Sequence, residues 1–212
     1  MTNNVYMHGI PKGKIIHDAV HGDIFVEDKF LKIIDTPEFQ RMRRIKQLSV
    51  ANIVFPSADH TRFSHSLGCF YVMKQIIAHF DSIFGKMGIE VSKQDKDIAL
   101  LAALLHDIGK LKINLADSQA LLTMNEDEVK AHTVLGYKMI KEEFELPEEI
   151  ARVALEHHEN NDGSGYPQGL SNDFITEYSQ IVNVANYYDN LAFNRTHIQV
   201  TNNKEALRSM LE

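Results

Sequence analysis

Histidine and aspartate side chains recur in this 212-residue sequence at the ends of apolar segments or inside them. Eleven histidines are present, and five of them occupy such positions together with two aspartates. These candidates are His65, His106, Asp107, His132, His157, His158 and Asp189. A mixture of imidazole and carboxylate ligands suits a borderline transition metal, whereas calcium and magnesium prefer shells made only of oxygen. The sequence therefore predicts a metal centre assembled from distant segments, because a helical bundle can bring such residues to one interior point.

The central segment of the chain supplies a ligand that two metal ions could share. Residues 98–105 are all apolar and contain no helix breaker, so they predict a helix that is buried on most sides. This helix ends at His106 and Asp107, and burying the two is costly unless a positive, well-coordinated partner holds them. The whole candidate set is too large for one ion that must also hold water. Two ions that share Asp107 as a bridging ligand would use every candidate.

The chemistry expected of such a pair is phosphoester hydrolysis. Two metal ions lower the pKa of a bridging water and clamp the oxygens of a phosphoryl group during in-line displacement. Asp107 would then be the central catalytic residue. Lys110 follows His106 by one helical turn and Arg62 precedes His65 by three residues, so both are placed to neutralise phosphate oxygens.

The elements that must position these residues are mainly helical. Residues 14–27 differ, because apolar runs on either side of a glycine predict a β-hairpin that turns near Gly22. His17 and His21 in this hairpin are interpreted as structural, since nothing downstream completes a site around them. After the hairpin, a short apolar helical face ends at Pro37. Helical spacing then predicts further helices over 39–48, 61–84, 92–105, 125–146, 148–158 and 174–193.

The predicted fold class is a mainly α-helical bundle with a small N-terminal β-hairpin. Residues 1–28 form the lead-in and the hairpin, and residues 29–212 form the bundle, in a single domain overall. Ser92 is a good N-cap for the central helix.

The composition supports a soluble, cytoplasmic protein. Hydrophobic residues make up 44% of the sequence and charged residues 24%, as in ordinary globular proteins. A single cysteine excludes a disulfide framework, and neither a signal peptide nor an apolar run long enough for a membrane span is expected. The net charge of -7 argues against binding a nucleic-acid polymer through a basic surface. It still allows a small phosphate-bearing substrate held by metal.

The pattern of candidate ligands resembles that of the HD superfamily of metal-dependent phosphohydrolases. In the C-terminal half, about residues 98–195, the resemblance is to HD-GYP domains, the cyclic di-GMP phosphodiesterases. It rests on His-Asp-Ile-Gly-Lys at 106–110, His-His-Glu at 157–159 and Asp-Gly-Ser-Gly-Tyr-Pro at 162–167, together with His132 and Asp189.

This resemblance implies two metal sites. The first metal would be held by His65, His106, Asp107 and Asp189. The second would be held by Asp107, His132, His157 and His158. Some members hold a third metal with a glutamate four residues before the first histidine, but Thr61 stands at that position here. Two divalent transition metal ions are therefore expected, Fe or Mn first, with Ni, Co and Zn as alternatives.

The N-terminal third, about residues 14–71, instead resembles the deoxynucleoside triphosphate triphosphohydrolases, in the branch that includes the sterile-alpha-motif HD enzymes. The matching segments include Asp-Ala-Val-His-Gly at 18–22 and Arg-Phe-Ser-His-Ser-Leu-Gly at 62–68. The resemblance implies that Gln47 contacts the sugar of the substrate and Arg62 a phosphate. It also implies that His132 is a catalytic histidine beside a single metal. His132 is thus either a ligand of the second metal or a proton donor.

Each resemblance has a departure. HD-GYP enzymes follow the aspartate helix with a basic stretch that grips the dinucleotide, and residues 195–199 keep Arg195 but lack the later basic residue. The triphosphohydrolases are normally much longer than this chain of 212 residues.

The expected function is therefore that of a metal-dependent phosphohydrolase acting on a nucleotide-type phosphoester, with HD-GYP-like phosphodiesterase chemistry favoured. Hydrolysis of deoxynucleoside triphosphates is the alternative activity, and a catalytically weak nucleotide-binding sensor is the alternative from another class. The expected catalytic residues are Asp107, Lys110 and His132. A nucleotide or cyclic nucleotide would be contacted by Gln47, Arg62, Lys110 and Arg195. A homo-oligomer is compatible with this reading.

Overall fold

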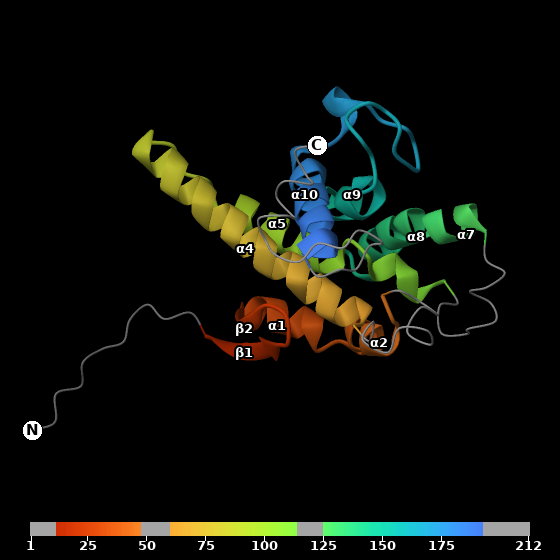
Figure 1. Ribbon diagram of the computed structural model, residues 1–212, viewed down its shortest axis with the longest axis horizontal. Coiled ribbons are helices and arrows are strands. Elements are labelled where there is room, and N and C mark those ends of the chain that lie inside the picture. Colours follow the sequence, from red (N-terminus) through yellow and green to blue (C-terminus); the bar gives the residue numbers. More distant parts are fainter. Residues whose placement is uncertain (1–11, 48–59, 114–124, 193–212) are drawn as a thin grey trace, which may run out of the picture.

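The computed structural model describes residues 12–47, 60–113 and 125–192, and Arg195 lies outside them. The chain begins with an antiparallel hairpin of β1 (Gly13–Asp18) and β2 (Gly22–Glu27), in which Gly13 pairs with Glu27 and Asp18 with Gly22. Gly22 has a positive φ of 74°, a conformation that glycine adopts without strain and that the tight turn requires. The hairpin predicted over 14–27 is confirmed, and Figure 1 shows it against α1 (Asp28–Ile34).

The segment after α1 differs from the prediction. Pro37 begins a helix instead of ending one, because α2 (Pro37–Arg41) has Thr36 as its N-cap and needs no backbone donor from its first residue. The helix predicted over 39–48 is also too long. It ends at Arg41 and continues only as the 3-10 turn η1 (Met42–Arg44).

Two helices form the centre of the bundle. The first, α4 (Arg62–Lys86), begins with a capping box in which Thr61 and Ser64 bond each other's backbone amides. The second, α5 (Lys93–Leu105), begins at the predicted N-cap Ser92 and buries most of its apolar residues. It passes behind α4 in Figure 1 and leads into the 3-10 turn η2 (Ile108–Leu111).

The remaining helices cover the end of this pair. The helix predicted over 125–146 is divided into α7 (Glu126–Lys130), α8 (His132–Lys138) and the π-helical turn η3 (Met139–Glu143). It is followed by α9 (Glu148–Glu156), the 3-10 turn η4 (Asn172–Phe174) and α10 (Glu177–Ala192). In Figure 1, α10 crosses in front of α4 and α5, and it also packs against α9. The mainly helical fold class is confirmed. No helix in the described part of the chain is long and apolar enough to cross a membrane.

Candidate metal centre

The predicted ligands lie where helix ends meet. His65 is in the first turn of α4, His106 is the C-cap of α5, and His132 is the first residue of α8. His157 is the C-cap of α9, and Asp189 lies near the end of α10. These five side chains and Asp107 are at most 1% exposed, so the centre is shielded from bulk water.

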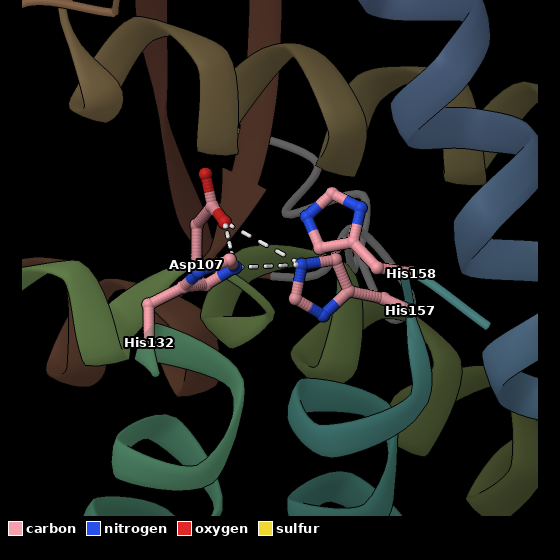
Figure 2. A group of neighbouring side chains, drawn as sticks. All are labelled: Asp107, His132, His157 and His158. Carbon is pink, nitrogen blue, oxygen red and sulfur yellow. Dashed lines mark hydrogen bonds and ion pairs between the residues drawn. The ribbon is translucent and has the colours of Figure 1, made fainter. Parts of the chain in front are cut away.

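Asp107 lies between two sets of imidazoles. Its Oδ1 is 3.5 Å from Nε2 of both His132 and His157. Dashed lines mark these two contacts in Figure 2. Its Oδ2 is 3.9 Å from Nε2 of both His65 and His106. One carboxylate therefore offers a separate oxygen to each histidine pair, which is the geometry that a shared ligand needs.

Two groups of donor atoms among the described residues are close enough to hold an ion, with all donors of a group within 4.8 Å of one another. One group consists of Asp107, His132, His157 and His158, and the other of His65, Cys69 and His106. Cys69 is not among the ligands that the sequence predicts. Its Sγ lies 3.7 Å from Nε2 of His65 because the two residues are four apart on α4, so the helical period was the signal that could have found it.

The backbone fixes which ring nitrogen faces the centre. Nδ1 of His106, His132 and His157 each lies within hydrogen-bond distance of a carbonyl oxygen, which can only accept. The acceptors are Ala103 at 2.9 Å, Val129 at 2.7 Å and Ala154 at 3.0 Å. Nδ1 therefore carries the proton, and Nε2 presents its lone pair towards Asp107.

Burial also favours the neutral form of three of these histidines. Desolvation lowers the pKa of His106 to about 3 and the pKa of His132 to about 2, and it lowers the pKa of His158 as well. A neutral imidazole is the form that binds a metal. The donor set fits a transition metal in both its chemistry and its protonation.

Two cations lie on the shared carboxylate. Nζ of Lys110 is 2.7 Å from Oδ1 and 2.8 Å from Oδ2 of Asp107, and Nη1 of Arg62 is 3.1 Å from Oδ2. Burial alone would raise the pKa of Asp107, but the positive charges of Lys110 and Arg62 hold it well below its usual value. Burial lowers the pKa of Lys110 to about 8, and the nearby Arg62 adds to this shift. Arg62 also donates to the backbone oxygen of Gln47 at 3.1 Å, so three of the predicted substrate contacts are neighbours.

Asp189 belongs to neither donor group. Its Oδ2 is 2.6 Å from Nδ1 of His65, and its Oδ1 is 3.1 Å from Nε2 of His21. A downstream residue, Asp189, therefore does lie against His21, which the sequence alone did not indicate. Burial acts to lower the pKa of His21, but its bonds to Asp18 and Asp189 raise it. Nothing in the local sequence of the hairpin indicates a contact with a helix so far along the chain. His17, by contrast, forms an exposed pair with Asp23.

The glycine-rich loop after α9 supports one face of the centre. The ring of Tyr166 stacks on His158, with centroids 4.6 Å apart and an interplanar angle of 21°. Glu159 is buried and accepts from the backbone amides of Gln168 at 2.7 Å and Leu170 at 2.9 Å. In the His-His-Glu segment, Glu159 thus anchors the loop that carries Tyr166.

A family model described as the HD domain matches residues 62–191, which include all seven predicted ligands. The chain belongs to the HD-domain family. Membership of the HD superfamily of metal-dependent phosphohydrolases, predicted from the sequence, is thereby confirmed.

Several known proteins are similar to part of the chain. Uncharacterized protein YwfO of Bacillus subtilis is 31% identical over 153 residues, which are 69% of this chain and 34% of that protein. Deoxynucleoside triphosphate triphosphohydrolase SAMHD1 of Homo sapiens is 40% identical over 96 residues, which are 45% of this chain and 15% of that protein. A crystal structure of a phosphohydrolase from Bacteroides thetaiotaomicron superposes with a TM-score of 0.57 at 26% identity, covering 86% of this chain and 41% of that one. The chain thus spans about a third of YwfO, 15% of human SAMHD1 and less than half of the solved phosphohydrolase.

Proposed function

We propose that this chain is a metal-dependent phosphohydrolase that uses two metal ions to hydrolyse a nucleotide-type phosphoester, with phosphodiesterase chemistry favoured. The observation that carries the proposal is the position of Asp107, which directs one carboxylate oxygen to His132 and His157 and the other to His65 and His106. When bound, divalent transition metals, Fe or Mn first, supply an activated water and neutralise the phosphoryl oxygens.

His132 fits the role of a ligand better than that of a proton donor. Its Nδ1 bonds the carbonyl oxygen of Val129, and its lowered pKa leaves Nε2 without a proton. That nitrogen lies 3.4 Å from Nε2 of His157 and shares Asp107 Oδ1 with it. A proton donor would need to hold the proton that this environment removes.

The protein's own cations complete the mechanism. Lys110 and Arg62 orient the Asp107 carboxylate and place two positive charges beside it, where negative charge on a phosphoryl group would develop. Gln47, next to Arg62 and 3.4 Å from the side chain of Asn190, is placed to bind the non-reacting part of a nucleotide. Asp189, which bonds His65, is proposed as a ligand or orienting partner of the first metal.

Hydrolysis of deoxynucleoside triphosphates is the second candidate. It is favoured by the similarity to SAMHD1, which is 40% identical over 96 residues in the human protein. That branch would need one metal and would release a nucleoside and triphosphate. Metal stoichiometry and product analysis therefore separate the two candidates.

Metal content is the first test. The purified protein, loaded with Mn²⁺ or Fe²⁺ and freed of excess, should contain two ions per chain by elemental analysis. Asp107→Ala should lose metal and activity together because the two oxygens of Asp107 face both histidine pairs. Asp127→Ala, at an exposed aspartate of α7, should change neither. One tight ion per chain would favour the triphosphohydrolase. Full metal in Asp107→Ala would refute the shared-ligand assignment.

Substrate class is the second test. Cyclic dinucleotides, cyclic mononucleotides, simple diesters and deoxynucleoside triphosphates should be assayed with both metals, with Asp107→Ala as the inactive control. Turnover of a diester to a phosphomonoester supports the proposal. Release of triphosphate would identify the second candidate, and metal binding without any turnover would favour a nucleotide-binding sensor.

A further inference from the structure

We propose that His21, in the turn of the N-terminal hairpin, is a positioning residue that orients the Asp189 carboxylate at the first metal centre, through an opening that Gly68 provides in α4. This inference rests on the metal centre of the proposed function. It adds a residue from outside the helical bundle, on an element that carries no proposed ligand.

A continuous chain of polar contacts connects the hairpin to the centre. Oδ2 of Asp18 lies 2.8 Å from Nδ1 of His21 and accepts from the His21 backbone amide at 2.9 Å. On the other side of the ring, Nε2 lies 3.1 Å from Oδ1 of Asp189. The second oxygen of Asp189 reaches Nδ1 of His65 at 2.6 Å. Each ring nitrogen of His21 thus lies against a carboxylate oxygen, and the imidazole joins Asp18 to Asp189.

Burial makes this chain of contacts consequential. The side chains of His21, Asp189 and His65 are at most 2% exposed, and that of Asp18 is 9% exposed. Water is therefore a poor substitute for the imidazole, and an oxygen of Asp189 that lost its donor would have to reorient. Hydrogen-bond partners behind a metal ligand commonly change metal affinity by about 10- to 100-fold.

Gly68 provides the independent observation. A Cβ at this buried position of α4 would overlap Oδ1 of Asp189 and lie only 2.6 Å from Cε1 of His21. The pair can therefore meet across α4 only because the helix has no side chain at this point. Gly85 of the same helix has no heavy atom within 4 Å of its would-be Cβ. It is a matched control for a change of glycine to alanine in α4.

The consequence is an oriented Asp189. With one oxygen held by His21, the other is directed to His65, whose Nε2 lies 3.2 Å from Nε2 of His106. The hairpin thus fixes the carboxylate and, through it, the ring of a proposed ligand. The second donor group, around His132 and His157, makes no contact in this series from Asp18 to His65.

The test measures the affinity of each Mn²⁺ equivalent by calorimetric titration of the full chain. His21→Ala should lower the affinity for one Mn²⁺ equivalent by about 10- to 100-fold and leave the affinity for the other unchanged. His158→Ala, which removes a donor of the second group, should weaken the opposite equivalent and so assign the sites. His21→Gln should recover most of the lost affinity, since its side-chain amide can still donate to Asp189. His17→Ala, at the exposed pair in the same hairpin, should match the wild type.

Gly68→Ala with Gly85→Ala as its control provides a second route if His21→Ala does not fold. Gly68→Ala should lower the affinity for the same Mn²⁺ equivalent as His21→Ala does, whereas Gly85→Ala should lower neither affinity. The inference is overturned if folded His21→Ala binds both equivalents like the wild type, or if His21→Gln is as weak as His21→Ala. Wild-type protein that binds two ions but hydrolyses no phosphoester would refute the proposed function alone. Wild-type protein that binds no metal would refute both the proposed function and the role of His21.

Discussion

Lys110 contacts both oxygens of the shared carboxylate, and this fixes its expected contribution. Its Nζ lies 2.7 and 2.8 Å from the two oxygens of Asp107, so its positive charge is held at the point between the two donor groups. Lys112, two residues on, is exposed and pairs with Glu143 on the surface. Comparing Lys110 with Lys112 therefore distinguishes the effect of a buried, positioned charge from that of an ordinary surface charge.

Lys110→Met should lower turnover by about 100-fold while metal content stays near that of the wild type. The reason is that a preorganised charge beside a developing phosphoryl oxyanion accounts for roughly 10²–10³ in rate, whereas the donor atoms themselves are unchanged. Steady-state kinetics and elemental analysis on the same preparation check this. Lys112→Met is the matched control and should keep full activity. Loss of metal from Lys110→Met would show that the lysine stabilises the centre instead of serving the reaction.

Among single residues, the sequence predicts those whose side-chain types carry chemistry on their own. His65, His106 and Asp107 were identified because buried imidazole and carboxylate need a common partner. Cys69 and His21 were not, since their importance comes from neighbours. Cys69 is one turn from His65, and His21 meets Asp189 only after the chain has folded back.

At the scale of elements, the site depends on where helices begin and end. Ser92 begins α5 by accepting from the backbone amide of Asp95 at 3.1 Å, and the same helix delivers His106 at its other end. Ser92→Ala should therefore lower the free energy of unfolding by about 1 kcal/mol, measured by urea denaturation. Metal content should not change. Gln94→Ala, at an exposed position of the same turn, should have a much smaller effect, and an equal loss would argue against capping as the cause.

A hydrogen bond that responds to pH joins the first turns of α5 and α10. The hydroxyl of Tyr178 donates to Oδ1 of Asp95 at 2.7 Å, and burial together with this bond raises the pKa of Tyr178 to about 12. The folded protein therefore keeps the proton at pH values where the unfolded chain has lost it. The stability due to Tyr178 is complete below about pH 10 and is lost as the pH rises towards 12.

Tyr178→Phe should consequently be less stable than the wild type at pH 8, and the difference should shrink by pH 11. Urea denaturation at the two pH values measures it. Tyr187→Phe, at an exposed tyrosine of the same helix, should follow the wild type at both. A constant difference between wild type and Tyr178→Phe would contradict the assigned bond.

Helix existence was easier to predict than helix boundaries. The apolar period of residues 98–105 led correctly to α5, but the division of 125–146 into three pieces did not show in the period. Pro37 was misplaced because proline ends one helix as readily as it begins the next, and only the Thr36 cap distinguishes the two cases. Packing between segments decides such details, and a single sequence does not display it.

At the scale of the whole molecule, metal and stability should be coupled. The donors come from α4, the end of α5, α8 and the end of α9, so an ion that binds them joins most of the bundle. A ligand at 100 times its Kd stabilises the folded state by about 2.7 kcal/mol per site. For a chain of this size, that predicts a rise in Tm of about 5–10 °C for each ion bound.

Thermal denaturation with Mn²⁺ and with EDTA measures this rise. Asp107→Ala should show the same Tm in both conditions, whereas Asp127→Ala should respond like the wild type. A wild-type Tm that ignores metal would mean that the two donor groups do not bind ions in the folded protein.

His65 and Asp189 are 124 residues apart, whereas His132 and His157 are separated by only 25. On the ribosome, the histidines around Asp107 can thus gather while α10 is still being translated, but the carboxylate that holds His65 arrives last. Ion capture during biosynthesis should accordingly be sequential, and nascent chains arrested before α10 should retain a partial complement of metal.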